Sequence, residues 1–231
     1  MDKTKLKKLP NGKGNYGECY IVDNNTLYKE FFRLDDGSYP FEKNYFNDMQ
    51  GIENGTFVFP KKIYTNGDYT LGYTMDYIHA YNLELIQLDF SLSDFIIALD
   101  RLKEDLKRLT ENGIVICDVN SRNILYDGKF HVIDTDLFTT EEKSGFNPEG
   151  NEKYLSEYLY YYVTEENNRY EFDDLLFSND ELYYVDKKIK NKCNMDILKD
   201  FLFELRDALL KETNFETDNF KDMYRIVKAK R

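Results

Sequence analysis

The stretch ICDVNSRNILYDGKFHVIDTD, residues 116–136, decides the fold because it places oxygen-bearing side chains at the ends of short apolar segments. Asp118 and Asn123 lie in a polar loop, and Asp134 follows an apolar pair. Carboxylate and amide oxygens are the ligands that Mg²⁺ prefers, and this ion leaves positions open for substrate phosphates. A further carboxylate can orient and deprotonate an incoming hydroxyl. The stretch therefore indicates phosphoryl transfer, with turn and capping roles as the alternative for Asp118 and Asn123.

A glycine-rich stretch nearer the N-terminus supplies a candidate phosphate-binding loop. GKGNYGECY at 12–20 has three glycines spaced G-x-G-x-x-G, and Lys29 follows within LYKEFF at 27–32. Glycine lets backbone N–H groups approach a phosphate closely. Taken alone, the triad is more typical of a hairpin turn, and Lys29 of a solvated strand lysine. The phosphate-binding interpretation therefore depends on residues 116–136.

The first 78 residues predict a small, strand-rich lobe. Asp23-Asn24-Asn25 and Asn66-Gly67 are turn sequences between β-prone runs, and they predict two hairpins. Between the hairpins, YPFEKNYFNDMQGI at 39–52 predicts the one helix of this lobe. A lobe boundary near His79 follows, because the sequence pattern changes soon after it.

From Ser91 the apolar residues recur at the three- and four-residue steps of a long helix. They are Leu92, Phe95, Ile96, Leu99, Leu102, Leu106 and Leu109. Ser91 and Asp94 form a candidate capping box, and Gly113 is a helix stop. GIVIC and KFHVID predict short buried strands around the polar loop, and further apolar stripes predict helices near 154–162 and 198–209. Residues 79–231 thus predict a larger, mainly helical lobe and an α+β chain.

Composition excludes several classes of function. The 231 residues carry 31 Lys and Arg against 43 Asp and Glu, a net charge of −12, which argues against a nucleic-acid-binding surface. No run approaches the roughly 18 apolar residues that cross a bilayer, and the N-terminus lacks the apolar stretch of a signal peptide. Cys19, Cys117 and Cys193 are odd in number and far apart, so we expect free thiols in a reducing cytoplasm and no structural zinc.

In this order, the motifs resemble those of the protein-kinase-like superfamily. GKGNYGECY is similar to its glycine-rich loop, and LYK to the strand that carries its phosphate-binding lysine. ENGIVICDVNSRNIL resembles the catalytic loop, VIDTD the metal-binding D-F-G, and TMDYI at 74–78 the hinge between the lobes. The likeness spans roughly residues 10–140 and implies a bilobal fold. That fold has a small antiparallel-sheet N-lobe with one helix and a larger, mainly helical C-lobe, with the catalytic loop at about 114–136.

The resemblance also implies ATP and Mg²⁺ as ligands and a role for each matching residue. Asp118 is the expected base, Asn123 and Asp134 hold the metal ion, and Lys29 holds the α- and β-phosphates. Glu42 is the expected helix carboxylate that fixes Lys29, with Glu53 as the fallback. The remaining nucleotide-binding set is the loop residues Gly12, Gly14, Tyr16 and Gly17 and the hinge residues Asp76, Tyr77 and Ile78.

Some positions depart from the family pattern. Ile116-Cys117 replace the usual His-Arg, and Thr135 and Asp136 replace the Phe and Gly of D-F-G. The resulting D-T-D is nearer to the I-D-x-D/E of aminoglycoside and choline phosphotransferases, although Asp136 alone is also typical of a cap. Arg122 resembles the tyrosine-kinase form of the catalytic loop, or else pairs with an acid.

We therefore expect an enzyme that transfers the γ-phosphoryl group of ATP to a hydroxyl. A protein acceptor (Ser/Thr or Tyr) is the leading expectation, and a small molecule is the alternative. A pseudokinase that binds nucleotide without catalysis is the second class, motivated by the missing His-Arg and Phe-Gly. An acidic pocket between the C-lobe helices would favour a cationic small molecule, whereas an open groove would favour a peptide.

Overall fold

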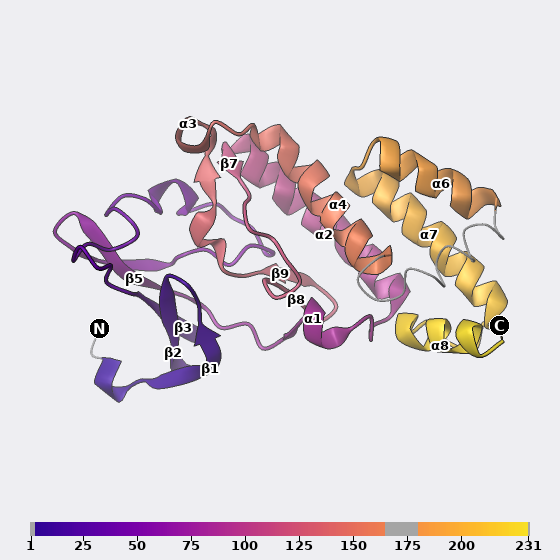
Figure 1. Cartoon of the computed structure of the whole chain (residues 1–231), viewed down its shortest axis with the longest axis horizontal. Coiled ribbons are helices and arrows are strands. Elements are labelled where there is room, and N and C mark those ends of the chain that lie inside the picture. Colours follow the sequence, from indigo (N-terminus) through magenta and orange to yellow (C-terminus); the bar gives the residue numbers. More distant parts are fainter. Residues whose placement is uncertain (1–2, 165–179, 231) are drawn as a thin grey trace.

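A sheet and a helical lobe follow one another along the long axis of the molecule, with the chain termini at opposite ends (Figure 1). The computed structural model describes residues 3–164 and 180–230. The α+β class predicted from the sequence is confirmed, because an antiparallel sheet is followed by a mainly helical part. The expected boundary at residue 78 falls between strands β5 and β6 and stays a prediction. Within the described ranges, no helix is long and apolar enough to cross a membrane.

The first lobe is a five-stranded antiparallel sheet in the order β1-β2-β3-β5-β4. Its strands are β1 (Lys7–Lys13), β2 (Gly17–Asp23), β3 (Thr26–Phe31), β4 (Lys62–Asn66) and β5 (Tyr69–Asp76), preceded by the 3₁₀ helix η1 (Lys3–Lys5). Both predicted hairpins are confirmed, β2–β3 around residues 24–25 and β4–β5 around Gly67, whose φ of 59° suits glycine. β3 is the central strand, so its side chains are flanked by those of β2 on one side and β5 on the other.

The one helix predicted in this lobe is wrong. Residues 39–52 form turns and a single short 3₁₀ helix, η2 (Asn47–Met49). Besides short turn bonds within the segment, its backbone binds the β4–β5 hairpin: the Phe41 carbonyl accepts from Thr70 N–H, and Lys43 N–H donates to the Asp68 carbonyl. Phe46 and Met49 are buried against the sheet. A helix this short is marginal by itself, so the sheet contacts determine its conformation.

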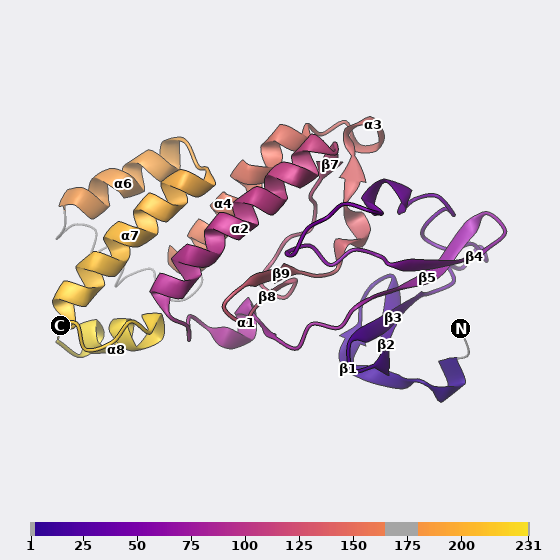
Figure 2. The ribbon, with the colours of Figure 1, turned by 180° about the vertical axis from the view of Figure 1, so that it is seen from behind.

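The second lobe is built on long helices that run side by side (Figure 2). Its elements are β6 (Tyr81–Asn82), α1 (Leu83–Ile86), α2 (Leu92–Glu111), β7 (Ile114–Val115), β8 (Ile124–Tyr126), β9 (Phe130–Val132), η3 (Thr135–Leu137), β10 (Thr139–Thr140), α3 (Glu141–Ser144), η4 (Pro148–Gly150), α4 (Asn151–Thr164), α6 (Asp180–Asn191), α7 (Met195–Glu212) and α8 (Phe220–Lys230). Helix α2 packs against α4 and α7, and α6 packs on α7.

The long helix predicted from Ser91 is confirmed as α2. The Ser91 hydroxyl oxygen accepts from Asp94 N–H, and Gly113, with φ 71°, follows the C-terminal end. All seven predicted apolar positions of this helix are buried. The stripe predicted near 198–209 forms part of α7 and is buried at Leu198, Phe201, Leu202, Leu205 and Leu209. In α4 the predicted stripe is buried at Leu155, Leu159 and Tyr162, whereas Tyr154 is exposed.

Two small sheets hold the polar loop that the sequence singled out. β7 pairs with β10, and β8 lies between β6 and β9. The loop between β7 and β8 contains Asp118 and Asn123, and Asp134 lies two residues after the end of β9. Because β8 and β9 are an antiparallel pair, the start of β8 and the end of β9 lie at the same end of this small sheet. The loop that contains Asp118 and the segment that contains Asp134 both adjoin that end.

Candidate active site

Lys29 of the central strand β3 is the best-defined charged group of the site. Its side chain is buried, and its neighbours across the sheet are Cys19 on β2 and Tyr73 on β5. The Lys29 ammonium pairs with the Asp134 carboxylate and lies 2.5 Å from Oδ2 of Asp136. The contact with Asp134 joins residues 105 positions apart, so it links the sheet to the polar segment after β9.

The charge of Lys29 is maintained by these two carboxylates. Burial alone lowers the pKa of the ammonium group, but attraction from Asp136 and then Asp134 outweighs it, so the pKa of Lys29 is raised. Burial also raises the pKa of Asp136, against the attraction of Lys29. Lys29 therefore stays charged in a buried position, with one carboxylate, Asp136, buried beside it and the other, Asp134, partly exposed.

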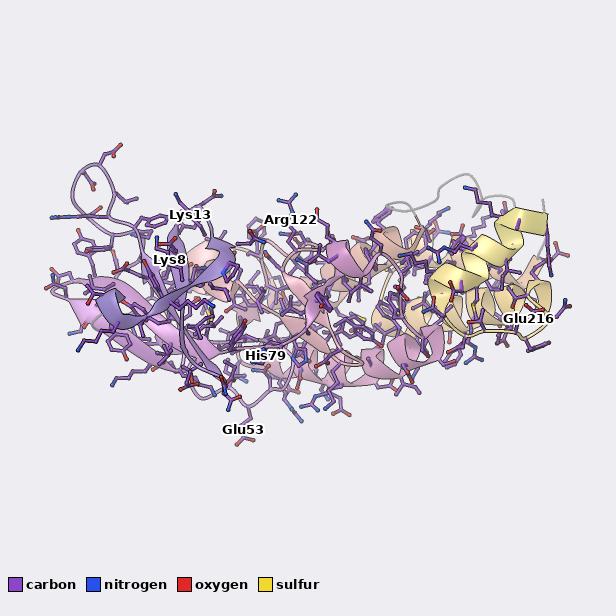
Figure 3. All side chains as sticks on the ribbon, turned by 90° about the horizontal axis from the view of Figure 1, so that it is seen from below. Lys8, Lys13, Glu53, His79, Arg122 and Glu216 are labelled. Atoms are coloured by element: carbon purple, nitrogen blue, oxygen red, sulfur yellow. The ribbon has the colours of Figure 1, made fainter. Side chains whose placement is uncertain are left out.

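The partner of Lys29 differs from the expected one. Glu42 is exposed and forms an isolated β-bridge with Tyr69, and Glu53 is exposed and projects away from the body of the molecule (Figure 3). The buried carboxylate is instead Asp136, whose Oδ1 accepts a hydrogen bond from the hydroxyl of buried Tyr73. Because residues 39–52 do not form the expected helix, neither Glu42 nor Glu53 is carried to Lys29, and the segment after Asp134 supplies the carboxylate.

Asp118 and Asp134 share an uncommon backbone conformation. Their φ angles are 52° and 58°, in the left-handed region that residues other than glycine rarely adopt. Asp134 stands before η3 without capping it through its side chain. Such strain persists only where surrounding structure holds it, and it clusters at functional sites. Both predicted site aspartates therefore sit in conformations that orient the carboxylate at some cost to stability.

Asn123 connects the two aspartate-bearing segments. The side-chain amide of Asn123 donates to the backbone carbonyl of Asp118 at 3.0 Å. The backbone carbonyl of Asn123 accepts from Ile133 N–H at 2.8 Å. Asp118 is exposed, and the amide of Asn120 lies at 3.5 Å from its Oδ1. The structure thus fixes the loop of Asp118 to the residue that precedes Asp134, while leaving the Asp118 carboxylate accessible.

The residues present suit a magnesium ion that is shared with phosphates. Within the described ranges, no group of three or more His, Cys, Asp or Glu side chains is arranged to hold a metal ion by itself. Mg²⁺ commonly takes one or two carboxylates and completes its shell with water and substrate phosphates. Asp134 is partly exposed and Asn123 is tied to its segment, so this pair fits that donor set.

The glycine-rich stretch is a hairpin between β1 and β2, so both interpretations of the triad describe the same loop. At Gly17 a Cβ would lie 2.3 Å from the Glu30 carbonyl oxygen, and at Gly12 it would lie 2.8 Å from the Cβ of Leu9. At Gly14 a Cβ would meet no atom within 4 Å. Tyr16 at the tip is exposed and contacts the Phe41 ring edge-on. Close strand packing explains Gly17, whereas Gly14 borders open space.

Of the predicted hinge residues, Asp76 ends β5, and Tyr77 and Ile78 lie in the connection to β6, which also contains His79, labelled in Figure 3. The exposed Asp76 carboxylate pairs with Lys61 at 2.5 Å, and Tyr77 N–H donates to the Asn25 carbonyl at 2.9 Å. Ile78 is partly buried against the core. The N–H of Tyr77 is thus already engaged, and its carbonyl is the group that it can offer to a nucleotide.

Sequence reasoning missed the role of two polar residues. Asp136 was noted as part of D-T-D, with a cap as the alternative, but not as a partner of Lys29; it is buried between Lys29 and Tyr73. A second acid two residues after Asp134, just before the apolar pair Leu137-Phe138, was the available signal. Asn151 was not singled out, although its buried amide accepts from Ile116 N–H at 3.0 Å and donates to the Ile114 carbonyl at 2.7 Å. Arg122 pairs with Glu84 at 3.1 Å, as the alternative interpretation predicted.

No family model matches the sequence, and no curated protein matches it. Among solved structures, the chain is similar to the kinase PK-1 of the Cydia pomonella granulovirus, with a TM-score of 0.45 and 20% identity over 59% of this chain and 55% of that one. It is also similar to the CAK complex of Chaetomium thermophilum bound to ATP-gamma-S, with a TM-score of 0.44 and 17% identity over 60% of this chain and 49% of that one. The chain therefore spans about half the length of each, and likenesses of this size bear on neither activity nor substrate.

Proposed function

We propose that this protein is an ATP- and Mg²⁺-dependent phosphotransferase that moves the γ-phosphoryl group to a hydroxyl acceptor. One observation carries the proposal: Lys29, buried in the central strand, pairs with Asp134, which lies in a left-handed conformation 105 residues later. A structural ion pair needs neither the strained backbone nor the partly exposed carboxylate. A site that must offer one cation and one carboxylate to a nucleotide needs the backbone conformation that holds the carboxylate and also its partial exposure.

Lys29 is the residue that would bind the α- and β-phosphates. Its ammonium group lies against Asp134 and Asp136, so phosphate oxygens would replace Asp134 as its anionic partner. Asp136 would keep its contact with Lys29, because it is buried and also accepts from Tyr73. Asp134, thereby released, would hold Mg²⁺ together with Asn123. When bound, this ion neutralises charge on the phosphates.

Asp118 is the residue that would accept the acceptor's proton. The hydroxyl oxygen forms a bond to the γ-phosphorus while the bond from that phosphorus to the bridging oxygen breaks. ADP leaves with the electron pair, and the hydroxyl proton passes to the Asp118 carboxylate. Its exposure and the weak contact from Asn120 at 3.5 Å leave it able to accept that hydrogen bond. The loop residues Gly12, Gly14, Tyr16 and Gly17 would cover the phosphates during the step.

The test is transfer from γ-labelled ATP with Mg²⁺, comparing the wild type with Asp118→Asn. Asparagine tolerates the left-handed conformation of residue 118, so the variant should fold as the wild type does. We expect turnover to fall by about a hundredfold or more, because general-base catalysis contributes at least that much. Equal turnover would remove Asp118 from this role. Nucleotide binding with no turnover in either protein would favour the pseudokinase.

A further inference from the structure

A cavity of about 400 Å³ lies directly beside Asp118. It is bounded by β7 and the residues after it, by the segment before α4, and by the first turn of α4, which meet on one side of the helical lobe (Figure 1). Its walls include Ile116, Cys117, Phe146, Gly150 and Tyr154. A volume of this size is at the lower end of small-ligand pockets, which are about 300–1,000 Å³.

The floor of the cavity is held rigidly. Asn151, itself a lining residue, is almost fully buried and bridges two backbone groups, the N–H of Ile116 just after β7 and the carbonyl of Ile114 in β7, at 3.0 and 2.7 Å. The same amide lies 3.4 Å from the Thr110 hydroxyl of α2. The position of β7, and with it the start of the loop that contains Asp118, is therefore fixed to both α2 and α4.

The walls are apolar and aromatic, with charge at one point. Phe146 and Tyr154 are two-fifths or more exposed, at 67% and 40%, so their rings are available for contact. Among the described residues that line the cavity, Asp118 is the one with a carboxylate. Burial, followed by the charge of Asp118, raises the pKa of the Cys117 thiol, so that group is neutral at physiological pH. The acidic pocket that would favour a cationic acceptor is not formed by these residues.

We infer that this cavity is the acceptor site and that it takes a hydroxyl carried on a neutral aromatic ring, that is, a phenol. The inference rests on the proposed function. A ring between Phe146 and Tyr154 places apolar surface against apolar walls and permits offset or edge-on aromatic contacts. Its hydroxyl then reaches the polar end of the cavity at Asp118. An aliphatic hydroxyl the size of serine would leave most of the cavity volume empty. A polycationic acceptor would meet one carboxylate, Asp118, among the lining residues.

Occupancy can be measured without any turnover, because the chain contains no tryptophan. Phe146→Trp places one reporter in the cavity wall, where the native ring is 67% exposed. Phe215→Trp is the matched control, since Phe215 is 70% exposed and is not a lining residue. We expect N-acetyl-tyrosinamide to change the tryptophan emission of the first variant saturably and not that of the second. N-acetyl-serinamide and choline should leave both unchanged.

The kinetic test uses the same three acceptors. Tyr154→Ala should raise the KM for N-acetyl-tyrosinamide about tenfold, with kcat changed less, because the ring contact is made in the ground state. Tyr154→Phe should restore the wild-type KM. At Gly150 a Cβ would meet no atom within 4 Å, so Gly150→Leu narrows the cavity without a clash at Cβ and should also raise KM.

The outcomes separate the acceptor class from the proposed function. Saturable emission changes with the phenol but no phosphoryl transfer would overturn the function and leave the ligand class standing. Transfer to the serine amide or to choline, with no response to the phenol, would overturn the ligand class alone. A neutral peptide with one tyrosine distinguishes the source of the phenol. A much lower KM than for the free amide assigns a protein acceptor, and an equal KM assigns a small phenol.

Discussion

Oδ2 of Asp136 lies 2.5 Å from the Lys29 ammonium, and this carboxylate takes the place that we expected of Glu42. Asp136 is buried, whereas Glu42 is exposed on a segment that forms no α-helix. The lysine of the sheet is thus fixed by the same short segment that contains Asp134. Positioning of Lys29 depends on residues 134–136 and not on a separate mobile helix.

Asp136→Asn should therefore destabilise the protein, and Glu42→Gln should not. Removing one partner of a buried ion pair lowers the free energy of unfolding by about 3–5 kcal/mol. Because Lys29 keeps its contact with Asp134, we expect a loss near about 3 kcal/mol. An exposed glutamate typically contributes within about 0.5 kcal/mol. Urea unfolding of both variants measures the difference. A larger loss for Glu42→Gln would show that the segment at 39–52 packs against Lys29 in solution.

Lys29→Met should reduce the free energy of unfolding by about 3–5 kcal/mol, because Asp136 is left buried without a counter-charge. Adding Asp136→Asn removes that uncompensated charge, so the double variant should recover most of the stability. Its ATP affinity should stay low, because the phosphate ligand is still missing. Calorimetric ATP binding to the double variant at wild-type affinity would exclude Lys29 as a phosphate-binding residue.

Gly14 and Gly17 should respond differently to alanine. Gly17→Ala forces a Cβ to within 2.3 Å of the Glu30 carbonyl oxygen, so β2 and β3 must shift. A forced fit of this kind costs about 1–3 kcal/mol. Gly14→Ala meets no atom within 4 Å and should leave the unfolding curve unchanged. If the loop covers phosphates, Gly14→Ala should weaken ATP binding about tenfold, which is about 1.4 kcal/mol; unchanged affinity would make the loop an ordinary hairpin.

The three free thiols should react slowly at neutral pH. Burial raises the pKa of Cys19 to about 11 and that of Cys193 to about 11, and it raises the pKa of half-buried Cys117 as well. Because the thiolate is the reactive form, the alkylation rate should rise about tenfold per pH unit while the pH stays below the pKa. Cys117 should be alkylated before the other two thiols, and mass spectrometry of digested samples would follow the order of modification. A rate that levels off near neutrality would mean a lowered pKa.

Much of the architecture could be predicted because it depends on local patterns. Helix α2 followed from one apolar stripe, a cap at Ser91 and a stop at Gly113, and the hairpins followed from Asn- and Gly-containing turns. The segment 39–52 could not be predicted this way. Its conformation depends on hydrogen bonds to the β4–β5 hairpin, which lies later in the sequence, and its residues have no strong preference that opposes those bonds.

The candidate site shows the same division between local and distant information. The aspartates and Asn123 were predicted as site residues because their residue types and spacing suit metal and phosphate chemistry, and these roles stay predictions. The pairing of Lys29 with Asp136 was missed because it is a tertiary contact, and its nearest sequence signal is a single acid with an ordinary capping alternative. The cavity beside Asp118 likewise forms only when α4 packs against β7, so its apolar character was not readable from the polar loop.

The central claim is that Lys29 and Asp134 form a magnesium-dependent nucleotide site. Isothermal titration calorimetry with ATP, with and without Mg²⁺, tests it most directly on the wild type, Asp134→Asn and Asp127→Asn. Asp127 is a matched control, because its carboxylate lies in the same lobe and contacts His131 at 3.1 Å. We predict that Mg²⁺ tightens ATP binding to the wild type and to Asp127→Asn but not to Asp134→Asn. Undiminished magnesium dependence in Asp134→Asn, or no ATP binding by the wild type, would contradict the account.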